Sequence, residues 1–158
     1  MDSRLYIKRA ENELKLAGII FKISEKLHIQ TDIFDIREPE TYYSSVIAHC
    51  YFCIFYSAKA YLFAKGIKTN APDEHKKTFN EFRKFVEKGT VDVELLKIYK
   101  EMLIRADVLL HIFKKEKDKR GRFTYRTLPQ ANREPAIESV NNAQFFYKNI
   151  FQLCGNKK

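Results

Sequence analysis

Residues 42–64 read YYSSVIAHCYFCIFYSAKAYLFA, and this stretch decides the fold. Apolar and aromatic residues occupy every face of the helix that it predicts, and Gly66 closes it just beyond. A helix that is apolar on all sides is surrounded either by other protein or by lipid. At 23 residues the stretch is long enough to span a bilayer. Burial inside a protein is favoured by the polar side chains spread through it, which are costly in lipid: Ser44, Ser45, His49, Ser57 and Lys59.

The length and composition predict one packed domain covering residues 1–158. Aromatic residues make up 14% of the chain, which is enough to fill a core, and 31% of the residues are charged, which is enough to solvate the surface. The formal net charge of +9 favours an anionic partner, although a basic protein that is merely soluble has the same composition.

The three cysteines indicate a reduced compartment. Cys50 and Cys53 form a C-x-x-C pair inside the apolar helix, with no second pair nearby, and Cys154 stands near the end. No basic-then-apolar leader precedes them. We therefore expect a cytoplasmic protein whose thiols act as small hydrophobic side chains, without a bound metal or cofactor.

Helical periodicity predicts four long helices and one short helix. The first begins near Ser3, a plausible cap, and ends near Leu27; after residue 64, turn chemistry around Pro72 leads to a short helix that stops at Gly89. Asp92 can cap the fourth helix, and Pro135 opens the last one, whose expected core stripe is Ala136, Val140, Ala143, Tyr147, Ile150 and Cys154. These helices predict an all-α, up-and-down antiparallel bundle with residues 42–64 inside.

One charged residue interrupts an apolar row of the fourth helix. The row is Ile98, Met102, Arg105, Leu109 and Ile112. A guanidinium among apolar neighbours is costly, so Arg105 either meets an acidic partner or lines a functional groove. The alternative is an arginine whose stem follows the apolar row while its head reaches water.

Two further features could contact phosphate. Residues 114–126 read KKEKDKRGRFTYR, and basic side chains alternating with aromatic ones can grip phosphates and stack on unpaired bases. A solvated loop is the alternative. His75 lies in the first turn of the short helix, a position that suits a phosphate and equally suits an ordinary surface histidine.

The sequence contains no glycine-rich phosphate loop, no G-x-S-x-G motif and no helical H-E-x-x-H motif. Arg105 and His111 remain as catalytic candidates. Six residues along a straight helix rotate a side chain by about 240° and raise it by about 9 Å, so these two side chains would not meet. Joint action on one phosphate would need a distorted helix or a second protomer.

The run from Tyr43 through Ile112, together with the last helix, resembles the HEPN family of small helical proteins. The likeness rests on the tyrosine- and alanine-rich helix at residues 43–64, on His75 after the following loop, and on the Arg105-Ala106-Asp107 run. It implies the helical-bundle fold and covers most of the chain.

The resemblance implies two functions. Many HEPN proteins are toxins or defence ribonucleases that act as homodimers without metal, and Arg105 and His111 fit their arginine–histidine spacing. His111 would then be the general acid or base, and Arg105 would stabilise the transition-state charge. Active members usually have a polar residue where this chain has Ala106.

The alternative is a non-catalytic HEPN protein that binds a nucleotide or partners a minimal nucleotidyltransferase, and the Arg105-Ala106-Asp107 run resembles this branch. In either case the ligand is RNA or a nucleotide and no membrane is involved. The residues expected to contact the ligand are Asp107, His75, Lys115, Lys119, Arg120, Arg122 and Tyr125.

Overall fold

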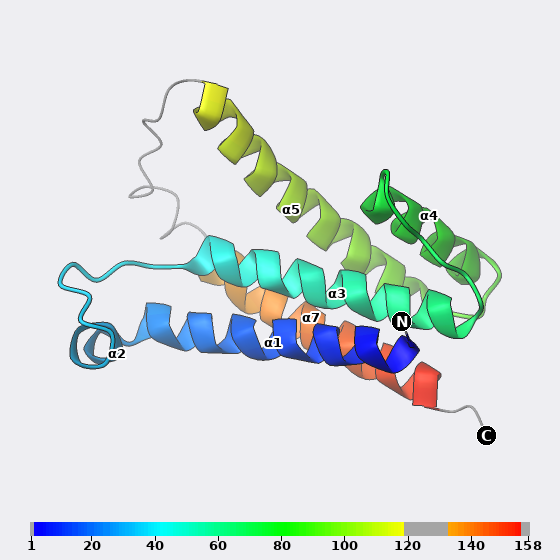
Figure 1. Cartoon of the computed structure of the whole chain (residues 1–158), viewed down its shortest axis with the longest axis horizontal. Coiled ribbons are helices and arrows are strands. Elements are labelled where there is room, and N and C mark those ends of the chain that lie inside the picture. Colours follow the sequence, from blue (N-terminus) through cyan, green and yellow to red (C-terminus); the bar gives the residue numbers. More distant parts are fainter. Residues whose placement is uncertain (1, 119–132, 156–158) are drawn as a thin grey trace.

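The chain folds into packed helices (Figure 1). The computed structural model describes residues 2–118 and 133–155, with side chains for 2–109 and 133–155. In order, the described helices are α1 (Ser3–Glu25), α2 (Leu27–Asp32), α3 (Tyr43–Ala64), α4 (Glu74–Glu87), α5 (Val93–Asp118) and α7 (Arg133–Gly155). The all-α prediction is confirmed for this part of the chain.

Helix α3 lies at the centre, as its sequence predicted. It packs along α1 and α7, and it also contacts α4 and α5. Among the described residues, α3 alone is long and apolar enough to cross a membrane, yet 72% of its most apolar window is buried inside the protein. The helix is therefore surrounded by other helices, which favours the protein-core interpretation over a lipid-spanning one. Cys50 and Cys53 are fully buried free thiols within it, as expected.

The N-terminal region differs from the prediction in two ways. Asp2, not Ser3, caps α1, because its carboxylate accepts a hydrogen bond from the amide of Arg4 at 3.2 Å. Helix α1 ends at Glu25 and not near Leu27, and the segment before α3 contains the additional short helix α2. The side chain of Gln30 on α2 is fully buried and makes three hydrogen bonds, to Ile23 O (2.8 Å), Glu40 O (2.8 Å) and Glu40 N (2.9 Å).

The boundaries of α4 and α5 follow from their local chemistry. Gly66 and Gly89 have φ values of 81° and 74°, a region that suits glycine, and they follow the ends of α3 and α4. Asp92 caps α5 as predicted, by accepting a hydrogen bond from the amide of Glu94 at 2.8 Å. Helix α5 starts beside α3 and then diverges from it toward residue 118 (Figure 1).

The core face of α7 is rotated from the predicted stripe. Phe146 and Ser139 are fully buried with Ala136, Ala143 and Ile150, whereas Val140, Tyr147 and Cys154 are only partly buried. Ser139 tolerates burial because its hydroxyl donates to Pro135 O at 2.6 Å and accepts a hydrogen bond from Arg105.

Candidate functional site

A pocket of about 920 Å³ opens where α5 diverges from α3. The first half of α3 forms one wall, the first turns of α4 form a second, and residues 103, 104, 106, 107 and 109 of α5 form a third. Apolar and aromatic side chains dominate the lining, and a volume of this size falls in the range of small-molecule sites. The lining residues are Glu40, Thr41, Tyr42, Ser44, Ser45, Ala48, Tyr51, Phe52, His75, Lys76, Phe79, Leu103, Ile104, Ala106, Asp107 and Leu109.

Helical spacing explains the α3 wall. Residues 44, 45, 48, 51 and 52 recur every three or four positions and therefore share one face of the helix. The small side chains of Ser44, Ser45 and Ala48 leave space near the start of α3, and the rings of Tyr51 and Phe52 follow one turn later. The small side chains on this face of α3 thus leave room for the pocket, and the aromatic side chains of Tyr51 and Phe52 contact His75 of α4.

His75 lies where α3 meets the start of α4. Its Nδ1 is 2.8 Å from the hydroxyl oxygen of Tyr51, and its ring stacks on Phe55 with 4.0 Å between centroids and 16° between planes. The residue as a whole remains exposed, so one ring face is covered while another part of the imidazole reaches solvent.

Burial sets the protonation of this pair. Desolvation lowers the pKa of His75, nearby Glu74 opposes that shift, and Lys59 adds to it. Desolvation also raises the pKa of the buried Tyr51 hydroxyl. Tyr51 therefore keeps its proton, and the tautomer of His75 decides which of the two groups donates in their hydrogen bond.

A buried lysine fixes the start of α4. Lys59 is 6% exposed, donates to Thr69 O at 3.0 Å and pairs with the carboxylate of Glu74, the residue before His75. Its ammonium also lies 4.9 Å from the ring centroid of Tyr6. The ion pair and the backbone contact together hold the connection and the first turn of α4 against α3, which positions His75.

Asp107 approaches the pocket from α5. It is exposed and shares the α5 wall with Leu103, Ile104, Ala106 and Leu109. Asp107 and His75 thus line one cavity from different helices, although they are far apart in the sequence. Both were predicted as ligand contacts, and the structure brings them to the same pocket.

Arg105 does not line this pocket. Its guanidinium donates to Ser139 Oγ at 3.0 Å and pairs with the carboxylate of Glu138, both on α7. The side chain is 25% exposed. Of the predicted environments, the structure shows the acidic partner, and the arginine, which stays partly exposed, joins α5 to α7.

The other predicted site residues cannot be placed by side chain. His111 and Lys115 belong to α5, which runs as one helix from Val93 to Asp118, but their side chains lie outside the described residues. Lys119, Arg120, Arg122 and Tyr125 also lie outside the described part of the chain. Arg105 and His111 belong to one continuous helix. That a second protomer is needed to bring such a pair together stays a prediction.

Sequence reasoning missed Tyr51, Phe52, Lys59 and Glu74 as parts of the site. A lysine in the middle of an otherwise apolar helix was the available signal, since a buried ammonium needs a partner. Across residues 2–109 and 133–155, no cluster of three or more histidine, cysteine or acidic side chains could hold a metal ion.

Comparisons with known proteins found no matching family model, no matching curated protein and no matching solved structure.

Proposed function

We propose that this chain is a HEPN-like up-and-down antiparallel bundle whose pocket binds a nucleotide, and that it acts without catalysis beside a minimal nucleotidyltransferase. One observation carries the proposal: His75 and Asp107 line the same largely apolar pocket, whereas Arg105 is engaged with Glu138 and Ser139 on α7. The polar groups that face the pocket are suited to binding. The guanidinium of Arg105, to which the resemblance gives a catalytic role, instead joins α5 to α7.

The pocket chemistry matches the parts of a nucleotide. A base stacks on the aromatic side chains Tyr51, Phe52 and Phe79, since every base has an apolar π-face. The phosphates lie near Lys76 and the solvent-facing side of His75 in the first turn of α4, where positive charge and helix amides favour anions. Asp107, on the opposite wall, accepts hydrogen bonds from ribose hydroxyls or an exocyclic amine.

The ribonuclease hypothesis is the second candidate. The Arg105–Glu138 pair supports it in one respect, because Glu138 is 59% exposed and Arg105 is 25% exposed. An exposed ion pair contributes little stability, so a phosphate of the RNA could replace Glu138 as the partner of Arg105. In that case a homodimer would bring Arg105 and His111 of the two copies into one cleft.

The remaining expectations belong to the same proposal. The chain works in the cytoplasm, where Cys50 and Cys53 stay reduced. Burial raises the pKa of the Cys50 thiol to about 12, so this thiol is unreactive at neutral pH.

Isothermal titration calorimetry with ATP tests the pocket. We expect saturable binding to the wild-type chain and a loss of at least tenfold in affinity for His75→Ala and for Asp107→Asn. His28→Ala and Asp32→Asn are matched controls, because both residues are exposed on α2 and do not line the pocket. Binding that is absent, or that His75→Ala and Asp107→Asn leave unchanged, would refute the proposal.

A further inference from the structure

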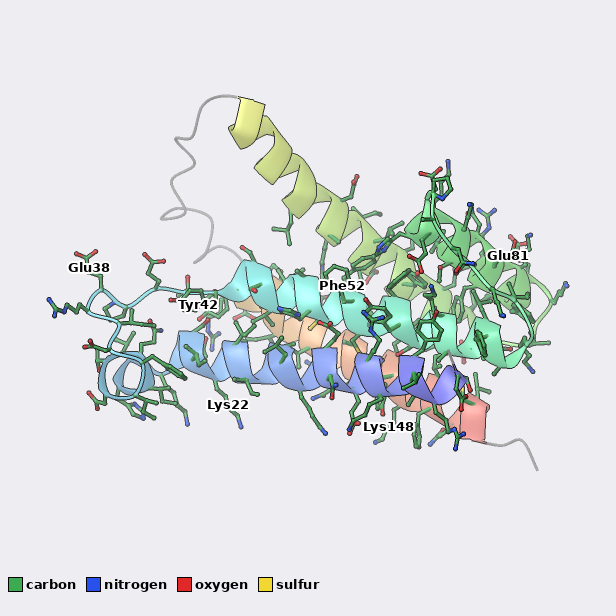
Figure 2. All side chains as sticks on the ribbon, viewed as in Figure 1. Lys22, Glu38, Tyr42, Phe52, Glu81 and Lys148 are labelled. Atoms are coloured by element: carbon green, nitrogen blue, oxygen red, sulfur yellow. The ribbon has the colours of Figure 1, made fainter. Side chains whose placement is uncertain are left out.

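A row of aromatic side chains leaves the pocket along α3. Phe52, Tyr56 and Phe63 lie at spacings of four and seven residues, so they share one helix face, and Tyr6 of α1 lies beside them. All four side chains are half-buried, so each presents part of its ring to solvent. Figure 2 labels Phe52 on α3, and α1 runs alongside that helix.

The rings form a continuous series that starts at His75. The centroid distances are 6.2 Å from His75 to Phe52, 6.4 Å from Phe52 to Tyr56, 6.5 Å from Tyr56 to Tyr6 and 6.1 Å from Tyr6 to Phe63. Each step is close to twice the rise of about 3.4 Å per base in a stacked strand. A strand whose bases are separated from one another could therefore place successive bases on successive rings.

Cationic groups accompany these rings. The guanidinium of Arg9 lies 4.3 Å from the Tyr56 centroid and donates to the Tyr56 hydroxyl at 2.9 Å. The ammonium of Lys68 lies 5.5 Å from the Phe63 centroid, and Lys76 lines the pocket at the other end of the row. Arg9, Lys68 and Lys76 are exposed. Their charges are therefore available to a ligand in solution.

The far end of the row is hollowed. A second pocket of about 140 Å³ is lined by Tyr6, Lys59, Phe63, Ile67, Lys68, Thr69 and Asn70. It contains two lysines and lies where the aromatic series ends. Its small volume fits a phosphate or a sugar edge better than a whole nucleotide.

We propose that this row, which we call the aromatic track (His75, Phe52, Tyr56, Tyr6 and Phe63), binds single-stranded nucleic acid. The bases stack on the rings and the phosphates contact Arg9, Lys68 and Lys76, with one end of the strand in the larger pocket. Aromatic platforms combined with neighbouring cations are the general means of binding unpaired strands. The inference rests on the proposed nucleotide pocket, and it adds that the ligand is an oligonucleotide that extends beyond that pocket.

Fluorescence polarisation with a 5′-labelled 12-nucleotide oligouridine and the full chain tests the track. Loss of one stacked base predicts at least about fivefold weaker binding for Tyr56→Leu and for Tyr6→Leu, whereas Tyr56→Phe keeps the ring and binds nearly as the wild type does. The matched control is Tyr147→Leu, because Tyr147 is a half-buried ring on α7 that contacts Phe151.

A charge series tests the phosphate contacts independently of the rings. Arg9→Gln should weaken binding and reduce the slope of log affinity against log salt by about 0.7, the value for one phosphate contact on a single strand. The control is Arg83→Gln, which removes an exposed arginine of α4 that is 3.4 Å from Glu87. If Tyr56→Leu fails to fold, Arg9→Gln carries the test.

Failure of the track can be told apart from failure of the pocket. If ATP binds and depends on His75, while the 12-mer binds no more tightly than ATP and ignores Tyr56→Leu and Arg9→Gln, the track is overturned and the pocket stands. If the 12-mer binds and depends on Tyr56 while ATP does not bind, the track stands and the nucleotide pocket fails. Equal binding of a duplex of the same length would also overturn the track, since its bases are not available for stacking.

Discussion

Replacing Lys59 by methionine should destabilise the protein and disturb the pocket. Methionine keeps the apolar stem of the lysine but removes the ammonium that donates to Thr69 O and pairs with Glu74. Thr69 is 5% exposed, so its carbonyl would lose a partner in a nearly dry environment. Glu74 would lose its counter-charge.

The expected magnitude follows from the burial of the two partners. Breaking a fully buried ion pair costs about 3–5 kcal/mol, and losing a hydrogen bond to a charged group costs about 1.5–3 kcal/mol. Lys59 is 6% exposed but Glu74 is 34% exposed, so water can partly solvate the remaining carboxylate. We therefore expect a loss of about 2–3 kcal/mol in the free energy of unfolding, or about 4–12 °C in Tm for a domain of this size.

Urea unfolding of Lys59→Met, Glu74→Gln and the double variant measures the interaction as a thermodynamic cycle. The coupling energy between the two positions should be at least about 1 kcal/mol, because the side chains are in direct contact. Lys97→Met, on an exposed position of α5, is the control and should stay within about 0.5 kcal/mol of the wild type. A coupling energy below about 0.5 kcal/mol, or a Lys59→Met chain as stable as the control, would refute this account of the buried lysine.

Two other predictions concern histidines. If the ribonuclease hypothesis holds, the wild-type chain should be a dimer by light scattering and should cut single-stranded RNA in EDTA to fragments ending in cyclic phosphate. His111→Ala should abolish this cleavage. Identical digests from the wild type and the variant would contradict the catalytic assignment. The pKa of His75 is lowered in the fold, so below about pH 6.5 the unfolded state binds a proton that the folded state resists, and stability falls as pH falls. The drop in Tm between pH 7.5 and 5.5 should therefore be smaller in His75→Phe than in the wild type; equal drops in both would show that His75 contributes nothing to this pH dependence.

Features encoded by neighbouring residues could be predicted from the sequence. The apolar character of residues 42–64 on all faces predicted the bounds of the central helix to within one residue. The position of Asp92 before the fourth helix predicted that it caps this helix. His75 and Asp107 were expected to contact a ligand, the first from its place in a helical turn and both from the resemblance; the structure shows that both line one pocket. Each of these signals is contained within a few positions of the chain.

Features that depend on distant pairing could not be predicted. The rotation of α7 places Phe146 and Ser139 inside, and the partner of Arg105 lies 33 residues away, so neither is visible in a local pattern. Helix α2 was missed; its buried Gln30 hydrogen-bonds to Ile23 and Glu40, and these bonds form only when the chain doubles back. The pocket also needs α5 to diverge from α3, and no periodicity in the sequence specifies that divergence.

The Gln30 side chain ties together the two ends of the segment between α1 and α3. The side-chain amide of Gln30 hydrogen-bonds to Ile23 in the last turn of α1 and to Glu40 shortly before α3, so these bonds hold both ends of the intervening bend. Arg37 and Glu38 are exposed at the tip of that bend, and Figure 2 shows Glu38 at the far end of the molecule from α4. A short epitope or a dye-bearing cysteine placed there would give a handle for immobilising the chain by the end that lies away from α4.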